Sequence, residues 1–321
     1  MHVMQTGKPV VARKQSSQSS ADNAGARDPS GAALDGQASV RRLSAGLYPV
    51  ATPIGNLGDI THRAIEVLNN ADLIICEDTR VTRKLLSRYA IATKSVSYND
   101  HNAPRVLPGL MERLDRGDSL ALVSDAGTPL ISDPGFRLVE AAIAGNIPVF
   151  PIPGANAALA GLVASGLPTD SFFFAGFLPS KSGARRTRLA ELANIPGTLV
   201  FYEGPSRLAA SLADMHLVLG NRAAAVAREL TKLHEEVIRG PLVYLATTYE
   251  ERGTPRGEIV IVVGPPLTEP IDDDTLRDAI KEALETMTLR DAASEVASQT
   301  GRPRREVYKM ALALAKPGPA D

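Results

Sequence analysis

The stretch Val-Ser-Asp-Ala-Gly-Thr-Pro-Leu-Ile-Ser-Asp-Pro-Gly, residues 123–135, decides the fold of this chain. It follows the apolar run Ser119–Val123 and precedes a helical pattern over Phe136–Ala144, so it lies at the carboxyl end of a predicted parallel strand. Open α/β sheets bind their ligands at this edge. A segment so rich in Asp, Pro and Gly is either an ordinary surface crossover or a rigid cradle for a small molecule.

Short apolar runs alternate with helical patterns on both sides of this stretch. Strands are predicted at Leu47–Ala51, Leu73–Cys76, Ser95–Tyr98, Ser119–Val123 and Pro148–Pro151. Helices are predicted at Thr61–Asn69, Thr79–Tyr89, Arg105–Arg116, Phe136–Ala144 and Ala155–Ser165. This alternation predicts an α/β domain over residues 44–166, with a parallel sheet covered by helices.

A second pattern occupies residues 167–264 and predicts a second α/β domain with a mixed sheet. Its strands are expected at Phe172–Ala175, Thr198–Tyr202, Ala223–Ala227, Glu236–Ile238 and Glu258–Val263, and its helices at Ala184–Asn194 and Pro241–Tyr249. Residues 265–274 are rich in Pro and Asp and predict a linker. Residues 275–315 predict a helical hairpin of helix–turn–helix type, broken at Thr300–Pro303.

Composition narrows the class of protein. The 321 residues predict about two domains with tails. A net charge of −1, 4% aromatic residues and no Trp argue against a protein that coats nucleic acid, although a local basic patch stays open. The single cysteine excludes an internal disulfide framework and a cysteine-built zinc site, and it fits a reducing cytoplasm. No metal site is predicted.

The first 43 residues are rich in Ser, Gln, Ala and Gly and have little apolar periodicity. They lack the apolar region of a secretory signal, so a disordered tail is predicted for residues 1–43. No run in the chain approaches the roughly 18 apolar residues that cross a bilayer. No membrane partner is therefore expected.

A polar or Gly/Pro-rich cluster follows each of the five strands predicted in the first domain. The clusters are Ala51–Ile60, Glu77–Arg80, Asn99–Asn102, residues 123–135 and Pro153–Asn156. Because the carboxyl ends of parallel strands meet at one edge of a sheet, five such clusters predict a ligand site there. The first cluster has neither the G-x-G-x-x-G fingerprint of dinucleotide sites nor the lysine of a P-loop.

These motifs resemble the tetrapyrrole methylase superfamily and, more narrowly, its branch that acts on ribosomal RNA. The resemblance is carried by Tyr48–Ile60, Glu77–Arg80, Asp100–Asn102, Asp125–Gly135, Pro153–Ala157, Phe201–Glu203, Arg228–Lys232 and Gly257–Val260. It extends from about Leu47 to Gly264, and the terminal helix pair is similar to a module appended in that branch. The N-terminal tail lies outside it.

The resemblance implies a cytoplasmic, homodimeric enzyme that binds S-adenosylmethionine and methylates the ribose 2′-hydroxyl of a cytidine in the decoding region of 16S ribosomal RNA. It places the cofactor contacts at Pro53, Asp125, Ala126, Gly127, Ala155, Asn156, Phe201, Tyr202 and Gly257. Small residues allow backbone groups to approach the cofactor. Asp125 could accept a hydrogen bond from the cofactor ammonium, but an Asx-turn explains it equally well.

A general base can assist methylation of a ribose hydroxyl, since that hydroxyl is a weak acid near neutral pH. Glu77 and His101 are the first candidates, followed by Asp100, because they follow strands at the ligand edge. Structural roles explain part of these clusters as well: Asp78 and Arg80 can form an ion pair within the cluster Glu77–Arg80, and His101 can be a turn residue.

Basic residues that could bind RNA phosphates form three groups. They are Lys181, Arg185, Arg186 and Arg188 in the second domain, Arg80, Arg83 and Lys84 in the first domain, and Arg304 with Arg305 near the C-terminus. A solvated helix face explains such a charge run as well.

Two other functions stay open from the sequence. A methyltransferase acting on a corrinoid or porphyrin precursor would have the same cofactor loop, although it does not require the basic runs. A ligand-sensing regulator that binds DNA through the terminal helices is the second alternative. Methyl transfer from bound S-adenosylmethionine distinguishes an enzyme from this regulator.

Overall fold

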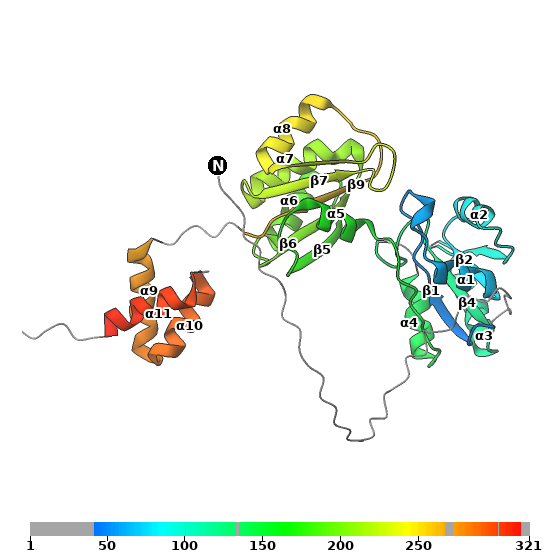
Figure 1. Cartoon of the computed structure of the whole chain (residues 1–321), viewed down its shortest axis with the longest axis horizontal. Helices are drawn as coiled ribbons and strands as arrows, with labels where there is room; N and C mark the ends of the chain where they lie inside the picture. Colours follow the sequence, from blue (N-terminus) through cyan, green and yellow to red (C-terminus); the bar gives the residue numbers. More distant parts are fainter. Residues whose placement is uncertain (1–41, 100, 133–134, 267–271, 301, 316–321) are drawn as a thin grey trace, which may run out of the picture. The chain divides into compact units, whose positions relative to one another are not determined.

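The computed structural model describes residues 42–99, 101–132, 135–266, 272–300 and 302–315 (Figure 1). The disordered tail predicted for residues 1–43 lies, except for its last two residues, outside the described residues. The described part of the chain contains two sheets and a C-terminal group of helices.

The first sheet is parallel, as predicted. It consists of β1 (Gly46–Pro49), β2 (Leu73–Cys76), β3 (Ser95–Ser97) and β4 (Ser119–Val123), in the order β1-β4-β2-β3. The strand predicted at Pro148–Pro151 is wrong in extent, since only isolated parallel bridges join Val149 and Ile152 to β1. Phe150 and Ile152 donate to the carbonyls of Leu47 and Pro49, but Pro49 has no N–H with which to return a bond to Phe150, so the ladder is interrupted there.

Helices cover both faces of this sheet because successive strand residues point to opposite sides. The helices α1 (His62–Asn70) and α2 (Thr79–Arg88) pack on the face that contains Val50, Ile74 and Ala121. The helices α3 (Ala103–Asp115) and α4 (Phe136–Ala144) pack on the face that contains Leu47, Ile75 and Leu120. A short 3₁₀ turn, η1 (Leu57–Asp59), follows β1.

The second sheet is mixed, as predicted. Its strands are β5 (Phe172–Phe177), β6 (Thr198–Glu203), β7 (Ala223–Arg228), β8 (Glu236–Pro241) and β9 (Ile259–Val263), in the order β5-β6-β9-β7-β8. The β5–β6 pair is parallel, and the other three pairs are antiparallel.

Four helices cover the second sheet (Figure 1). The helices α6 (Ser182–Leu192), α7 (Leu208–Leu219) and α8 (Leu242–Arg252) pack on one face. On the other face lies α5 (Ala157–Ser165), although the sequence pattern groups α5 with the first domain. A Cβ added to Gly161 of α5 would lie 2.7 Å from Val260 Cγ1, so this glycine allows the helix to approach β9 closely.

The helix α7 and the 3₁₀ turn η2 (Pro205–Arg207) before it are not predicted by the sequence pattern. Leucine, alanine and valine occur on nearly all sides of α7, so it lacks the single apolar stripe by which a helix is recognised. It is buried along much of its length, since it lies between α6 and α8. Tertiary packing, and not amphipathic periodicity, accounts for this helix.

The C-terminal group consists of α9 (Asp273–Thr286), α10 (Leu289–Thr300) and α11 (Arg304–Ala315). Leu276, Ile280, Val296 and Val307 form part of its own small core. The predicted pair α10–α11 is present, and α9 is a further helix that contacts both. It starts inside the predicted linker, where the Asp272 carboxylate accepts hydrogen bonds from two N–H groups of its first turn.

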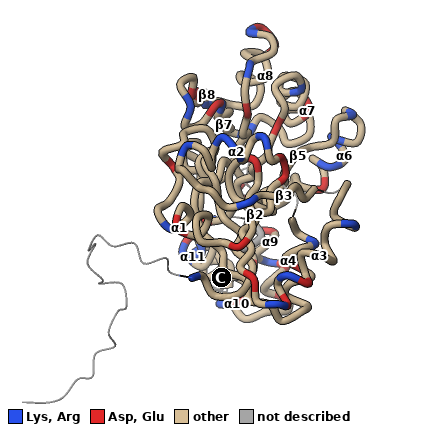
Figure 2. Tube along the Cα trace, turned by 90° about the vertical axis from the view of Figure 1, so that its right-hand side faces the viewer, with Lys and Arg blue, Asp and Glu red and all other residues tan. Residues whose placement is uncertain are grey.

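Lysine and arginine are interspersed with aspartate and glutamate along the described chain (Figure 2). This agrees with a formal net charge close to zero. No described helix is long and apolar enough to span a membrane.

Candidate active site

The loop after β4 is held in place by backbone bonds to its neighbours. Gly127 adopts a φ of +81° and exchanges two hydrogen bonds with Thr52, of 2.8 and 3.0 Å, in the loop after β1. The Thr128 hydroxyl donates to the Ala155 carbonyl, 3.1 Å away, just before α5. Leu130 and Ser132 also have positive φ, which is uncommon for residues with a Cβ. The loop is therefore a fixed structure with local strain, as a cradle requires.

The segment Arg228–Lys232 closes the site from the second sheet. Glu229 and Thr231 have positive φ, and the Thr231 hydroxyl accepts a hydrogen bond of 3.1 Å from the Asn56 N–H. The Lys232 ammonium contacts the carboxylates of Glu229 at 2.7 Å and Glu258 at 3.1 Å. These contacts join the loops that follow β1 and β7.

Gly257 is required by this arrangement. Its φ is +98°, and an added Cβ would lie 2.3 Å from the carboxyl carbon of Glu229. A side chain here would therefore meet both backbone strain and a direct clash.

The first cavity lies among these loops and has a volume of about 370 Å³. Its wall is mostly apolar. The lining residues are Ile54, Asp125, Ala126, Gly127, Thr128, Ile131, Ser132, Ala157, Phe177, Tyr202, Glu203, Gly204, Pro205, Leu230, Gly257, Glu258, Ile259 and Val260. Its volume is in the range of small-molecule sites, roughly 300–1,000 Å³.

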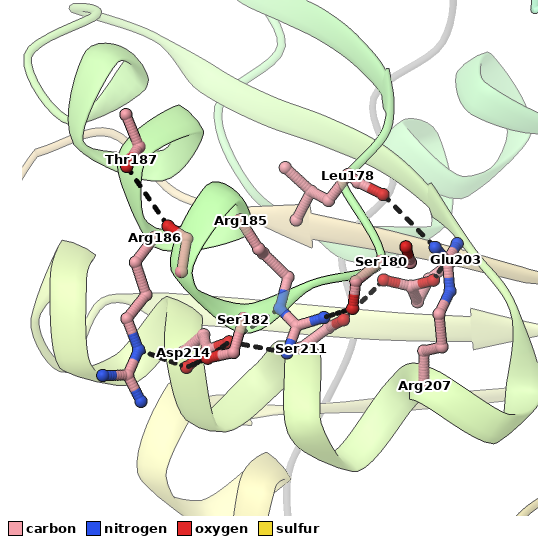
Figure 3. Close-up of polar contacts among 11 residues, drawn as sticks. Leu178, Ser180, Ser182, Arg185, Arg186, Thr187, Glu203, Arg207, Ser211 and Asp214 are labelled. Carbon is pink, nitrogen blue, oxygen red and sulfur yellow. Dashed lines mark hydrogen bonds and ion pairs between the residues drawn. The ribbon is translucent and has the colours of Figure 1, made fainter.

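Glu203 at the end of β6 places a buried carboxylate in this wall (Figure 3). It accepts hydrogen bonds from the Ser211 hydroxyl at 2.5 Å and the Gly204 N–H at 2.7 Å. The Arg207 guanidinium lies 2.6 Å from it and also donates to the Leu178 carbonyl. The charge of Glu203 is therefore fully partnered, and its role in the wall is structural.

The second cavity, of about 400 Å³, is lined by polar residues that follow β2, β3 and β4: Glu77, Asp78, Thr79, Arg80, Ser97, Asn99 and Asp125. Asp78 caps α2 and binds the Arg80 guanidinium through two nitrogens, Nε and Nη2. Hydrogen bonds from Arg80 lower the pKa of Asp78 to about 2. The ion pair anticipated between Asp78 and Arg80 is confirmed.

Five of the predicted cofactor residues line the first cavity: Asp125, Ala126, Gly127, Tyr202 and Gly257. Pro53, Ala155 and Asn156 are not among the lining residues, but Ile54 and Ala157 beside them are. The side-chain oxygen Oδ1 of Asn156 instead caps α5 by accepting from the Leu159 N–H at 3.1 Å.

Phe201 requires a correction. Its side chain is fully buried on the α6–α8 face of the second sheet, opposite the face on which its neighbour Tyr202 lies. Successive side chains of β6 alternate between the two faces, and the Phe201 side chain packs among the core residues of the α6–α8 face. Phe201 is a core residue, and its side chain does not reach the first cavity.

Several lining residues were not predicted. Ile131 and Ser132 belong to the opening stretch, whereas Phe177 comes from the end of β5. The register of β5 shifts between Phe174 and Gly176, and a Cβ on Gly176 would lie 3.2 Å from the Ser132 hydroxyl oxygen. A bulge is not visible in an apolar run, so periodicity gave no signal for Phe177.

Two of the three candidate bases, Glu77 and His101, lie in the described part of the chain. Glu77 lines the second cavity, and the Ser97 hydroxyl donates to its backbone carbonyl. His101 is exposed just before α3 and is not among the lining residues of either cavity. Asp100 lies outside the described residues.

Arg185 also requires a correction, since it was predicted to bind RNA. Its side chain is 4% exposed and lies 2.6 Å from the carboxylate of Asp214 on α7 (Figure 3). It donates to the Ser180 carbonyl as well, at 3.2 Å. A buried, paired guanidinium is a structural group and cannot reach a phosphate.

The other predicted basic residues are accessible to different degrees. Arg186 is half-exposed and shares Asp214, and Arg188 pairs with Glu191 on the surface of α6. Lys181 is exposed. Arg304 and Arg305 are exposed at the start of α11, whereas the neighbouring Arg302 contacts Asp273 and Glu306.

The loops of two sheets share a ligand-sized cavity with a strained, Gly-containing cradle at its edge, an arrangement typical of α/β proteins that bind a small molecule. Residues 46–246 match the family described as Tetrapyrrole (Corrin/Porphyrin) Methylases, and residues 269–315 match the RsmI C-terminal HTH domain. The chain belongs to the tetrapyrrole methylase family and is a methyltransferase. The alternative of a non-enzymatic regulator is therefore wrong.

Curated relatives cover most of the chain. A Mesorhizobium japonicum protein is 52% identical over 278 residues, which are 85% of this chain and 94% of that protein. A Synechocystis protein is 46% identical over 277 residues, 85% of this chain and 99% of that protein. Both are named Ribosomal RNA small subunit methyltransferase I.

Solved structures support the fold at low sequence identity. A cobalt precorrin-4 methyltransferase matches with a TM-score of 0.52 and 14% identity, covering 72% of this chain and 98% of its own. A diphthine synthase matches with a TM-score of 0.54 and 14% identity, covering 68% of this chain and 89% of its own. These likenesses concern the fold alone.

Proposed function

We propose that this chain is an S-adenosylmethionine-dependent ribosomal RNA methyltransferase that modifies the ribose 2′-hydroxyl of a cytidine in the decoding region of 16S ribosomal RNA. The observation that carries the proposal is the pair of cavities that meet at Asp125, one mostly apolar and one polar. The names of relatives with 45–52% identity supply the substrate class.

The first cavity fits the methyl donor in size and chemistry. Ile54, Leu230 and Tyr202 offer apolar surface to an adenine ring, and Gly127 and Gly257 leave the backbone open where a Cβ would intrude. When bound, the donor supplies a methyl group on a positively charged sulfur. We propose Ala126, Gly127, Tyr202 and Gly257 as its contacts, with Pro53, Ala155 and Asn156 supporting the same loops, whereas Asp125 lies where this cavity meets the second one.

The protein contributes mainly positioning, because the methyl group is already activated. Loops from both sheets fix the cavity walls through the Thr52–Gly127 backbone pair and the Asn56–Thr231 bond. Of the bases predicted from the sequence, Glu77 remains a candidate because it lines the polar cavity. His101 is exposed and would act only through contact with RNA.

We propose Lys181, Arg186, Arg188, Arg304 and Arg305 as phosphate contacts, since each has an exposed or partly exposed cationic group. Such contacts hold RNA without reading its sequence.

We propose that the protein is a homodimer and acts in the cytoplasm, where its RNA substrate is assembled. Exposed apolar side chains on α5 and β5 support self-association: Leu159, Val163, Phe172, Phe173 and Phe177. Light scattering on the purified protein measures the assembly state, and a monomer at micromolar concentration contradicts the proposal.

The decisive experiment is transfer of a tritiated methyl group from S-adenosylmethionine to small ribosomal subunits, naked 16S ribosomal RNA and uroporphyrinogen in parallel. We expect label on RNA, at a cytidine 2′-oxygen located by nuclease digestion and mass spectrometry. Label on uroporphyrinogen alone supports the corrinoid or porphyrin alternative and overturns the proposal.

Gly127→Arg tests the cavity itself. A long side chain here enters the first cavity, since an added Cβ already lies 3.2 Å from Ile54, so donor affinity measured by calorimetry should fall at least about tenfold. Gly109→Arg is the matched control, because nothing lies within 4 Å of a Cβ added at this exposed position of α3. Equal donor affinity in both variants contradicts the assignment of the cavity.

A further inference from the structure

We infer that Asp125 orients the acceptor hydroxyl and takes up its proton, and that the second cavity receives the ribose of the target nucleotide and not its phosphate. The inference rests on the proposed function, whose reaction it deepens. It assigns Asp125 to the acceptor, whereas the resemblance alone suggests the ammonium of the donor.

The position of Asp125 is the first argument. Among the described residues, Asp125 alone lines both cavities. Only Ser124 separates Asp125 from the end of β4, so the rigid sheet sets the backbone position of Asp125. A group that must contact the acceptor at the point where donor and acceptor meet has to lie at such a junction.

The hydrogen bonds of Asp125 are the second argument. Its Oδ1 accepts from the Asp78 N–H at 3.2 Å, and no other donor from the described residues lies within hydrogen-bonding distance of this carboxylate. Half-buried carboxylates are ordinarily bonded more fully than this. The Oδ2 oxygen is therefore available to a ligand, in contrast to Glu203, both of whose oxygens are occupied.

The charges of the second cavity are the third argument. Three of its seven lining residues are carboxylic acids, and its one guanidinium, on Arg80, is already bound by Asp78. A phosphate would meet the negative charge of Asp125 in a cavity whose one guanidinium is already engaged. Hydroxyl groups donate hydrogen bonds to carboxylates, so the cavity favours the sugar of the nucleotide.

The environment of Asp125 suits it to accept a proton. Burial raises its pKa, and the charge of Asp78 raises it further, against the lowering effect of the Asp78 N–H bond. Glu77 and Arg80 face it in the second cavity, Glu203 and Glu258 lie in the first, and the buried Cys76 thiol is also nearby. A raised pKa makes the ionised carboxylate a stronger base.

The proton balance is simple. As the 2′-oxygen forms its bond to the methyl carbon, the carbon–sulfur bond of the donor breaks and its electron pair remains on sulfur. The hydroxyl proton passes to Asp125 and then to water. Activity should therefore decline as pH falls through the raised pKa of Asp125, because a protonated carboxylic acid cannot take up the proton of the acceptor hydroxyl.

The test compares Asp125→Asn, Asp125→Glu and the surface control Asp115→Asn. We expect Asp125→Asn to reduce kcat at saturating donor by about 10²-fold or more and to abolish the acid limb of the pH profile. Donor affinity by calorimetry should change less than about threefold, which also demonstrates folding. Asp125→Glu should restore part of the rate together with the acid limb.

RNA binding provides a second readout that does not depend on turnover. A target-sequence oligonucleotide with ribose at the acceptor cytidine should bind the wild type about tenfold more tightly than its 2′-deoxy analogue. Asp125→Asn should lose this preference, and Asp115→Asn should keep it.

The outcomes separate the inference from the proposed function. If the wild type methylates RNA, but Asp125→Asn weakens donor binding and leaves kcat at saturating donor unchanged, Asp125 holds the donor and the inference is wrong. If the wild type binds the donor but labels no RNA, the proposed function fails and the inference fails with it. An unchanged kcat and donor affinity in Asp125→Asn also overturns the inference alone.

Discussion

The basic residues of α6 and those of α11 are alike in sequence but different in structure. Both helices contain two adjacent arginines near their N-terminal ends, Arg185–Arg186 in α6 and Arg304–Arg305 in α11. On α6 the first arginine is buried against Asp214 and the second shares that carboxylate, whereas on α11 both are exposed. A charge run therefore does not reveal its role until the partner of each charge is known.

The difference originates in α7. Asp214 lies on this helix, 4% exposed, and accepts hydrogen bonds from Ser182, Arg185 and Arg186 (Figure 3). It fixes the first turn of α6 to α7. The terminal helices contain no equivalent acid for Arg304 or Arg305 among the described residues, although Arg302 has Asp273 and Glu306.

The largest expected effect is the loss of stability when the buried acid Asp214 is removed. Asp214→Ala leaves the Arg185 guanidinium buried without a counter-charge, so the free energy of unfolding should fall by about 3–5 kcal/mol. Urea denaturation measures it. Glu191→Ala, which removes the exposed partner of Arg188, is the matched control and should cost less than about 1 kcal/mol. Equal losses in the two variants would mean that Arg185 is not a structural cation.

Substitution of the exposed arginines on α11 should weaken RNA binding and leave the stability of the protein nearly unchanged. Arg304→Ala combined with Arg305→Ala should reduce the slope of log affinity against log salt by about 2, one for each phosphate contact. Unfolding should change by less than about 0.5 kcal/mol, since both side chains are exposed. Filter binding to 16S ribosomal RNA at several salt concentrations measures the slope, and an unchanged slope removes α11 from the RNA interface.

The smallest expected effect is the pH dependence of the stability that the Asp214 carboxylate contributes. Burial alone would raise its pKa, but hydrogen bonds from Arg186, Ser182 and Arg185 outweigh burial and lower it. A lowered folded-state pKa contributes stability that is complete above the unfolded value, about 3.9, and is lost as pH falls through the folded value. The stability difference between wild type and Asp214→Asn should thus shrink below about pH 4. A constant difference down to pH 2 would contradict the lowered pKa.

Periodicity located most elements of the fold. β2, β4 and α4 have the predicted boundaries, because each is an uninterrupted apolar run or stripe between turn residues. The predicted extent of the strand at Pro148–Pro151 is too large, because a pattern of apolar residues does not show where N–H donors are missing from a ladder. The placement of α5 on the second sheet could not be predicted, since an apolar helix between two domains can pack on either.

For the site, the opening stretch and Gly257 could be predicted because they carry backbone requirements that few residues satisfy. Gly127 and Gly257 have positive φ, and their neighbours line the first cavity. Phe201 and Arg185 could not be placed correctly, since their roles depend on which face of a strand or helix meets the core. Phe177 depends on a bulge in β5.

The sequence by itself determined the parallel sheet, the mixed sheet, the resemblance to a methylase family and the loops at the carboxyl ends of the strands. These follow from local rules, namely the period of apolar residues and the backbone preferences of Gly and Pro. Only the tertiary structure decided that Asp125 joins two cavities and that Arg185 is buried against Asp214. The partners of these charges lie 29 to 47 positions away in the chain, and no local pattern encodes such a contact.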